Sequence, residues 1–185
     1  MKMTIWLNPS LFFIKKNVTP NKLLFFNLFV LLFAMMFLEL WVANVLDIHQ
    51  PKKIIGFFLV ATFITIPFYY IINFIFSVLL GIILVILKKD FSVLRLYTVV
   101  LSANSFIFLF NAATLYIIWI NNAPQLFYTL TITLLLIVNI LYIRILYFGL
   151  VNYVGVTKKI SFIIAAIILF ITFSTTSYGV VHYAS

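Results

Sequence analysis

The densest run of charge in the middle of the chain is Lys88-Lys89-Asp90-Phe91-Ser92-Val93-Leu94-Arg95. Two long apolar blocks precede this run and three follow it. About 20 apolar residues are enough for a helix to cross a hydrocarbon core of about 30 Å, so each block is a candidate membrane span. The run then marks a turn outside the membrane. The pattern predicts an all-α integral membrane protein, a bundle of five transmembrane helices with its N-terminus in the cytosol and its C-terminus outside.

The composition is typical of a protein whose solvent is lipid. Of the 185 residues, 66% are hydrophobic and 8% are charged, and the mean hydropathy is +1.27. A formal charge of +9 would also suit nucleic acid, but the positive residues stand in short clusters between apolar blocks. There they orient a membrane protein and contact anionic headgroups, so we expect membrane lipids and no nucleic acid as partners. The absence of cysteine excludes disulfides and thiolate chemistry.

Two parts of the chain are expected, an N-terminal segment over residues 1–22 and a single membrane domain over 23–185. In the segment, Asn8-Pro9-Ser10 followed by LFFIKKN predicts a short helix along the cytosolic headgroups. A frayed tail with an aromatic anchor is the alternative. The domain is expected to have five spans, at about 23–46, 54–87, 96–120, 126–150 and 160–177.

The second span is the least regular of the five. Its block, 54–87, is longer than one perpendicular span requires and too short for two. Pro67 divides it, so we expect a crossing helix over 66–87 and a short helix over 54–65 near the outer interface, joined by a proline kink. A single long tilted helix is the alternative.

The orientation follows from the distribution of positive charge. With the N-terminus inside, Arg144 can extend to the cytosolic side, and only Lys52 and Lys53 lie outside. Nine further positive residues are cytosolic: Lys2, Lys15, Lys16, Lys22, Lys88, Lys89, Arg95, Lys158 and Lys159. Ten of the twelve positive residues then share one side, which is the bias expected for cytosolic loops.

Three stretches resemble the YIP family, the Ypt/Rab-interacting membrane proteins and their short bacterial relatives. They are the Asn8-Pro9 start with LFFIKKN, the central KKDFSVLRLYTVVLSANSF, and LYIRILYFGLVNYVGVTKKISFIIAAIILF. The resemblance implies five spans with a cytosolic N-terminus and a bacterial inner-membrane protein of undefined activity, without catalytic residues. Eukaryotic members have a longer N-terminal region, so GTPase binding is not carried over. An organelle membrane is the alternative location.

Five polar residues within the predicted spans are candidate functional residues: Glu39, Asn104, Asn111, Asn139 and Arg144. An acidic side chain within a span is costly, at about 2.5 to 3.5 kcal/mol at the helix centre, so Glu39 suggests either a structural hydrogen bond or a proton or cation path. Arg144 is expected to extend toward the inner interface, since its predicted depth differs from that of Glu39, and a buried pair with Glu39 is the alternative. Asn104, Asn111 and Tyr97 recur every seven residues on one helical face, and we expect them to bond neighbouring helices.

No cofactor or metal ion is expected. Asp47, His49, His182 and Glu39 fall on the outer side in this topology, but their spacing matches no tight ligand motif. No glycine-rich phosphate loop or hydrolase pattern is present either, so we do not expect an enzyme.

Three functions remain open. The leading hypothesis is a non-enzymatic membrane protein that acts through helix packing with a partner membrane protein or with itself. Its cytosolic contacts with partners or lipid would come from Lys15, Lys16, Lys88, Lys89, Arg95, Lys158 and Lys159. A small transporter or channel subunit that uses Glu39 and the polar stripe around Asn104 is the first alternative. An accessory subunit of a larger membrane complex is the second.

Overall fold

The computed structural model describes residues 5, 8–14, 18–121 and 124–184, and within them the chain forms helices joined by short turns, without strands. In chain order the helices are α2 (Pro9–Ile14), α3 (Pro20–Val45), α4 (Pro51–Ile86), α5 (Val93–Asn121), α6 (Pro124–Gly149), the π-helix η1 (Leu150–Val154) and α7 (Lys158–Ala184). The prediction of an all-helical chain is therefore confirmed for the described residues.

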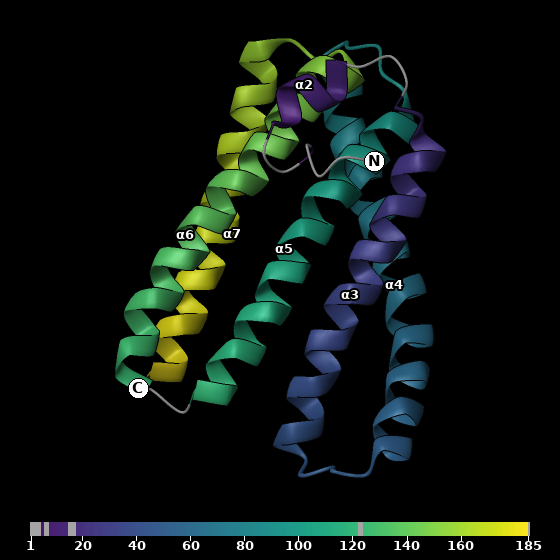
Figure 1. The fold of residues 1–185 in the computed structure, drawn as a ribbon. Coiled ribbons are helices and arrows are strands. Elements are labelled where there is room, and N and C mark those ends of the chain that lie inside the picture. The colour runs from purple at the N-terminus through teal and green to yellow at the C-terminus, as the bar shows by residue number, and fades with distance from the viewer. Residues whose placement is uncertain (1–4, 6–7, 15–17, 122–123, 185) are drawn as a thin grey trace.

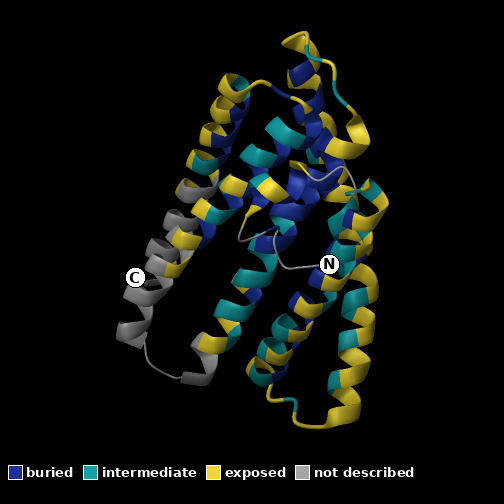
Figure 2. Ribbon diagram, turned by 45° about the horizontal axis from the view of Figure 1, so that its top comes forward, coloured by how far each residue is buried: buried dark blue, intermediate teal, exposed yellow. Residues whose placement is uncertain are grey.

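Four stretches are long and apolar enough to cross a membrane among the residues searched. They are Pro20–Val45, Pro51–Ile86, Val93–Ile117 and Ile137–Val154. Their outward faces carry large apolar side chains that the protein itself leaves uncovered, visible as exposed positions along α4 in Figure 2. This surface fits a multi-pass membrane protein, because lipid covers such side chains as well as a protein core does. The count of five spans stays a prediction.

Helix α4 is continuous through Pro67, and residues 54–65 belong to the same helix as residues 66–86. This arrangement corresponds to the single long helix rather than to two separate helices. A proline ring removes one backbone hydrogen bond, and the bonds on either side are enough to hold the helix together. At 36 residues, α4 is about 54 Å long, so it must tilt or extend beyond a hydrocarbon core of about 30 Å.

Helix α5 lies at the centre of the bundle. It packs against α3, α4 and α6, whereas α7 packs against α6 and η1 (Figure 1). Every residue from Leu96 to Ala103 is buried, which requires neighbours on all sides of this part of the helix. The short α2 lies across α6 and η1 and buries Phe12 and Phe13.

Helices α3 and α4 end in the same backbone motif. Asp47 and Lys88 adopt the left-handed conformation, with φ of 56° and 52°. After Lys88, the Lys89 N–H donates to the Leu84 carbonyl and the Lys88 N–H donates to the Val85 carbonyl, which is the pattern of a Schellman motif. Such ends reverse the chain within a few residues, so α4 and α5 lie antiparallel.

The turns of the bundle separate into two ends. Figure 1 places α2, the α4–α5 turn and the start of α7 at one end, and the α3–α4 loop and the end of α7 at the other. We call the first the basic end, because Lys22, Lys88, Lys89, Arg95, Lys158 and Lys159 lie on the elements that meet there. Lys52 and Lys53 lie at the opposite end, in the first turn of α4.

Candidate functional site

Polar side chains join the three helices of the α3–α4–α5 core. Asn27 on α3 donates a hydrogen bond of 2.9 Å to the Ser102 hydroxyl on α5. Asn104 on α5 donates to the side-chain oxygen of Asn73 on α4. Asn27, Asn73 and Ser102 are all buried. We call these four residues the polar seam. The two bonds that join its members run between helices, so Asn104 lies where the sequence predicted a helix-to-helix contact.

Two tyrosines extend the contacts of α4. The Tyr70 hydroxyl donates to the Leu24 carbonyl on α3 over 2.8 Å, and the Tyr97 hydroxyl on α5 donates to the Tyr70 carbonyl over 3.3 Å. Asn111, seven residues beyond Asn104, is exposed. The predicted stripe of Tyr97, Asn104 and Asn111 therefore does not line one continuous polar path, since its first two members face α4 and its third faces outward.

The pair of Asn73 and Asn104 offers a direct test of the polar seam. Replacing both with leucine is expected to show a coupling energy of about 0.6 kcal/mol, and at most about 1.7 kcal/mol, in a double-mutant cycle of unfolding in detergent. The exposed Asn111 is the control, because Asn111→Leu combined with Asn73→Leu should be additive. Additive effects for Asn73 and Asn104 would contradict a hydrogen bond of structural importance.

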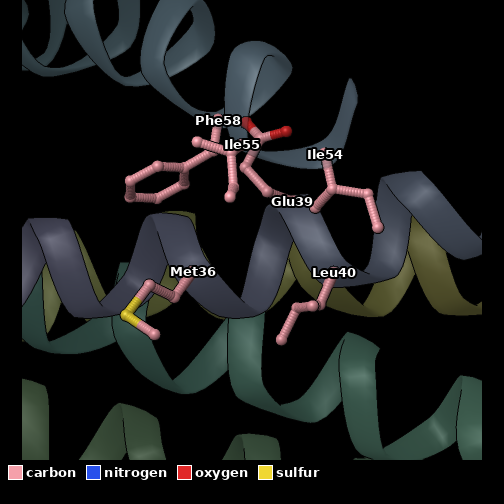
Figure 3. Close-up of a pocket in the computed structure, with 6 residues that line it drawn as sticks. All are labelled: Met36, Glu39, Leu40, Ile54, Ile55 and Phe58. Carbon is pink, nitrogen blue, oxygen red and sulfur yellow. The ribbon is translucent and has the colours of Figure 1, made fainter. Parts of the chain in front are cut away.

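Glu39 lies in the C-terminal third of α3 and is buried, with 4% of its surface exposed. Its Oε2 atom has no hydrogen-bond partner among the described residues. Figure 3 shows the side chain directed from α3 toward the first turns of α4. There it borders an apolar groove of about 220 Å³ whose other lining residues are Met36, Leu40, Ile54, Ile55 and Phe58.

Arg144 does not pair with Glu39. It is exposed on α6, a helix that makes no packing contact with α3 in the described part of the chain. Within the same residues the one close contact between a basic and an acidic side chain joins His49 Nε2 to Asp47 Oδ1, 2.8 Å apart and exposed on the α3–α4 loop. Asn139 is buried on α6. Glu39 and Arg144 are thus separate features, as their predicted depths required.

The lysines and the arginine that the sequence predicted as cytosolic contacts differ in how far they are exposed. Lys88, Lys158 and Lys159 are exposed and Lys89 is half-buried, all at the basic end. Lys15 and Lys16 lie outside the described residues. Arg95 is also engaged within the protein, because its guanidinium donates a hydrogen bond of 3.4 Å to the Tyr153 carbonyl and lies 5.4 Å from the centre of the Tyr153 ring.

Tyr153 contacts several segments of the chain, a role that the sequence did not predict. Its hydroxyl donates to the Val18 carbonyl over 3.2 Å, and its ring lies 5.6 Å from that of Phe13. Together with Arg95 it joins three segments that are far apart in the chain: the N-terminal segment, the start of α5 and η1. An aromatic residue in a basic turn was the only available signal, and such residues are common at membrane interfaces.

No group of three or more potential ligands able to hold a metal ion occurs among the described His, Asp and Glu residues. Asp47 and His49 form a pair only, and the side chain of His182 lies outside the described ones. The residues with distinctive chemistry are therefore Glu39 with its groove and the cations of the basic end. No family model, curated protein or solved structure matches this chain.

Proposed function

We propose that this chain is a non-enzymatic, five-span membrane protein whose basic end is cytosolic and docks a partner membrane protein, a second copy of the chain or anionic lipid. The observation that carries the proposal is the convergence of the basic end. Lys22 comes from α3, Lys88 and Lys89 from the α4–α5 turn, and Lys158 and Lys159 from the first turn of α7. These cations are separated by up to 137 positions in the chain, from Lys22 to Lys159, yet they lie at one end of the bundle (Figure 1).

The proposed orientation places this end in the cytosol, because positive residues are enriched in cytosolic loops. Helix α7 is the proposed fifth span, since it is 27 residues long and begins at the basic end. Five spans then leave the N-terminus inside and the C-terminus outside. The resemblance to short bacterial YIP proteins agrees with this topology, and membrane organisation of that kind, in a bacterial inner membrane, is our proposed role.

The topology has a sharp test because the chain has no cysteine. Ser92→Cys, in the α4–α5 turn, should resist a membrane-impermeant thiol reagent in intact cells and react after permeabilisation. Gln50→Cys, in the exposed α3–α4 loop, is the matched control and should react in intact cells. Ser185→Cys should behave like Gln50→Cys if α7 crosses the membrane. Labelling of Ser92→Cys before permeabilisation would overturn the orientation.

The docking role is tested by mild extraction of the tagged protein, followed by amine crosslinking and mass spectrometry. A stoichiometric partner or second copy should crosslink to Lys88, Lys89, Lys158 or Lys159. Changing these four lysines to glutamine should reduce its recovery about tenfold, the effect of losing ~1.4 kcal/mol of binding. The control replaces Lys52 and Lys53 at the opposite end and should leave recovery unchanged. Equal losses from both sets of changes would contradict docking at the basic end.

Transport is the second candidate function, and the observation that favours it is the buried carboxyl of Glu39, whose Oε2 atom has no hydrogen-bond partner in the described part of the chain. In a transporter, Glu39→Gln should abolish flux of a proton or cation in proteoliposomes. In a docking protein, the same change should alter stability alone. The polar seam gives transport no support, because its members bond to one another across helix interfaces.

A further inference from the structure

We infer that the basic end binds anionic phospholipid, in which its exposed lysines contact the phosphate group and the neighbouring apolar helix faces contact the acyl chains. The four exposed lysines are Lys22 on α3, Lys88 after α4, and Lys158 and Lys159 at the start of α7. We call them the edge lysines. The inference rests on the docking function proposed above, and it names a lipid, rather than a protein, as the ligand.

Positive charge at the basic end greatly exceeds negative charge. Six cations lie on its elements, whereas Asp90 is the one acidic residue there. The other two acidic residues of the chain, Glu39 and Asp47, lie toward the opposite end of the bundle. Among the described residues, no edge lysine forms an ion pair. This surface therefore favours an anionic ligand.

Stabilisation of the helices does not account for this gathering of charge. A positive charge is favourable beside the carboxyl end of a helix, which fits Lys88 after α4, and unfavourable beside the amino end. Lys158 and Lys159 occupy the first turn of α7, so their charges oppose the helix dipole. Both residues are also exposed, so they add no packing to the core. These two lysines therefore contribute to the surface of the protein rather than to the stability of its fold.

The edge lysines of α3 and α7 stand at one end of apolar helix faces that the protein leaves uncovered. On α3, Phe25 lies one turn after Lys22 on the same face and is 63% exposed. On α7, Phe162 lies one turn after Lys159 on the same face and is 67% exposed. Further exposed apolar residues continue the two faces: Phe29, Phe33 and Met36 on α3, and Ile163 and Phe170 on α7. A phospholipid has the same order of groups, with a phosphate at the membrane surface and apolar chains beneath it.

Helix α4 has this order in reverse, since its exposed Val85 and Ile86 come just before Lys88. An acidic protein in the cytosol could pair with the edge lysines but would leave the apolar faces uncovered. A partner span could cover the apolar faces but brings no anion to the lysines. An anionic phospholipid supplies both groups, and lysines near an anionic leaflet are attracted to it. Phosphatidylcholine carries a positive group beside its phosphate, so the edge lysines favour an anionic lipid over it.

The test titrates the delipidated full chain, in non-ionic detergent, with phosphatidylglycerol or with phosphatidylcholine of the same acyl chains. Native mass spectrometry counts the bound lipid. Phosphatidylglycerol should bind at least about tenfold more tightly, a difference of ~1.4 kcal/mol. A glutamine variant with Lys22→Gln, Lys88→Gln, Lys158→Gln and Lys159→Gln should lose this preference and still bind phosphatidylcholine as the unmodified chain does. The matched arginine variant, with Lys22→Arg, Lys88→Arg, Lys158→Arg and Lys159→Arg, keeps every charge and should retain the preference.

A soluble competitor separates a lipid from a free phosphate. Glycerol phosphate has the anion without acyl chains, so an excess of it should not displace phosphatidylglycerol. Circular dichroism checks that both variants keep their helices, and the comparison of the two lipids on the unmodified chain does not depend on either variant. Equal affinity for the two lipids, a retained preference in the glutamine variant, a lost preference in the arginine variant, or displacement by glycerol phosphate would overturn the inference.

The lipid titration and the crosslinking experiment above can fail separately. A stoichiometric protein partner crosslinked at the basic end, together with equal affinity for the two lipids, would overturn the lipid inference and leave the docking function standing. Equal affinity for the two lipids without any crosslinked partner or second copy would overturn both proposals.

Discussion

Replacing Gly149 with leucine is expected to lower the free energy of unfolding by about 3 kcal/mol, at the upper end of the usual range for overpacking a buried site. A Cβ atom at this position would lie 2.5 Å from Cγ1 and 2.9 Å from Cγ2 of Val99 on α5. Gly149 has φ of −64° and ψ of −46°, an ordinary helical conformation. The cost is therefore steric, and it reports the close approach of α5 and α6.

The measurement is unfolding in mixed micelles with increasing denaturing detergent, followed by circular dichroism. Gly56→Leu is the matched control, because a Cβ atom at Gly56 on α4 would meet nothing within 4 Å. Its stability should stay within about 0.5 kcal/mol of the unmodified chain, as for most surface changes. A second arm places Gly149→Ala in a Val99→Ala background, where removal of both Cγ atoms should relieve the clash. Equal destabilisation at the two glycines would contradict the close contact.

Replacing Tyr153 with alanine is expected to release the N-terminal segment from the bundle. The change removes the ring contact with Phe13, the position of the Arg95 guanidinium over the ring, and the hydroxyl bond to the Val18 carbonyl. Loss of a large buried aromatic side chain costs about 3 to 5 kcal/mol, and much of this loss falls on the docking of α2. The effect should be local, because the α3–α4–α5 contacts do not include Tyr153.

Limited trypsin digestion measures this release, since Lys15, Lys16 and Lys22 follow α2 in the chain. Cleavage there should be at least about tenfold faster in Tyr153→Ala, corresponding to ~1.4 kcal/mol or more of lost protection. Tyr153→Phe keeps the ring and loses only the hydroxyl bond, worth about 1 kcal/mol, so its cleavage should increase less. If Tyr153→Ala is cut no faster than the unmodified chain, Tyr153 does not hold the segment.

Much of the helical framework could be predicted from the sequence, because the hydropathy of each block is strong and the turns between blocks are polar. The predicted span over 23–46 compares with α3 at Pro20–Val45, and the span over 126–150 compares with α6 at Pro124–Gly149. The second block was harder, because Pro67 suggested a division that neighbouring backbone hydrogen bonds make unnecessary.

The candidate site was predicted only in part. Glu39 stood out because an acidic residue is costly within a span, and the structure places it in a buried position where its Oε2 atom has no hydrogen-bond partner among the residues described. Its groove was not foreseen, because the groove depends on which residues of α4 lie opposite Glu39. Asn104 and Asn111 share a helical face in the sequence, yet Asn104 bonds α4 and Asn111 is exposed. Burial depends on whether a neighbouring helix covers that face at the same depth.

By itself, the sequence determined the helical class, the approximate limits of the helices and the gathering of positive charge in particular turns. The helices follow from backbone physics, since a chain in lipid must satisfy its hydrogen bonds within each apolar segment. The positive charges lie in the turns because a charged side chain is costly within a span. Only the tertiary structure decided that α5 is central, that Asn104 meets Asn73, and that Tyr153 joins Arg95 to the N-terminal segment. The physical reason is that lipid-facing and helix-facing side chains are equally apolar in a membrane protein. Lateral packing therefore depends on steric fit and a few interhelical hydrogen bonds, which hydropathy does not report.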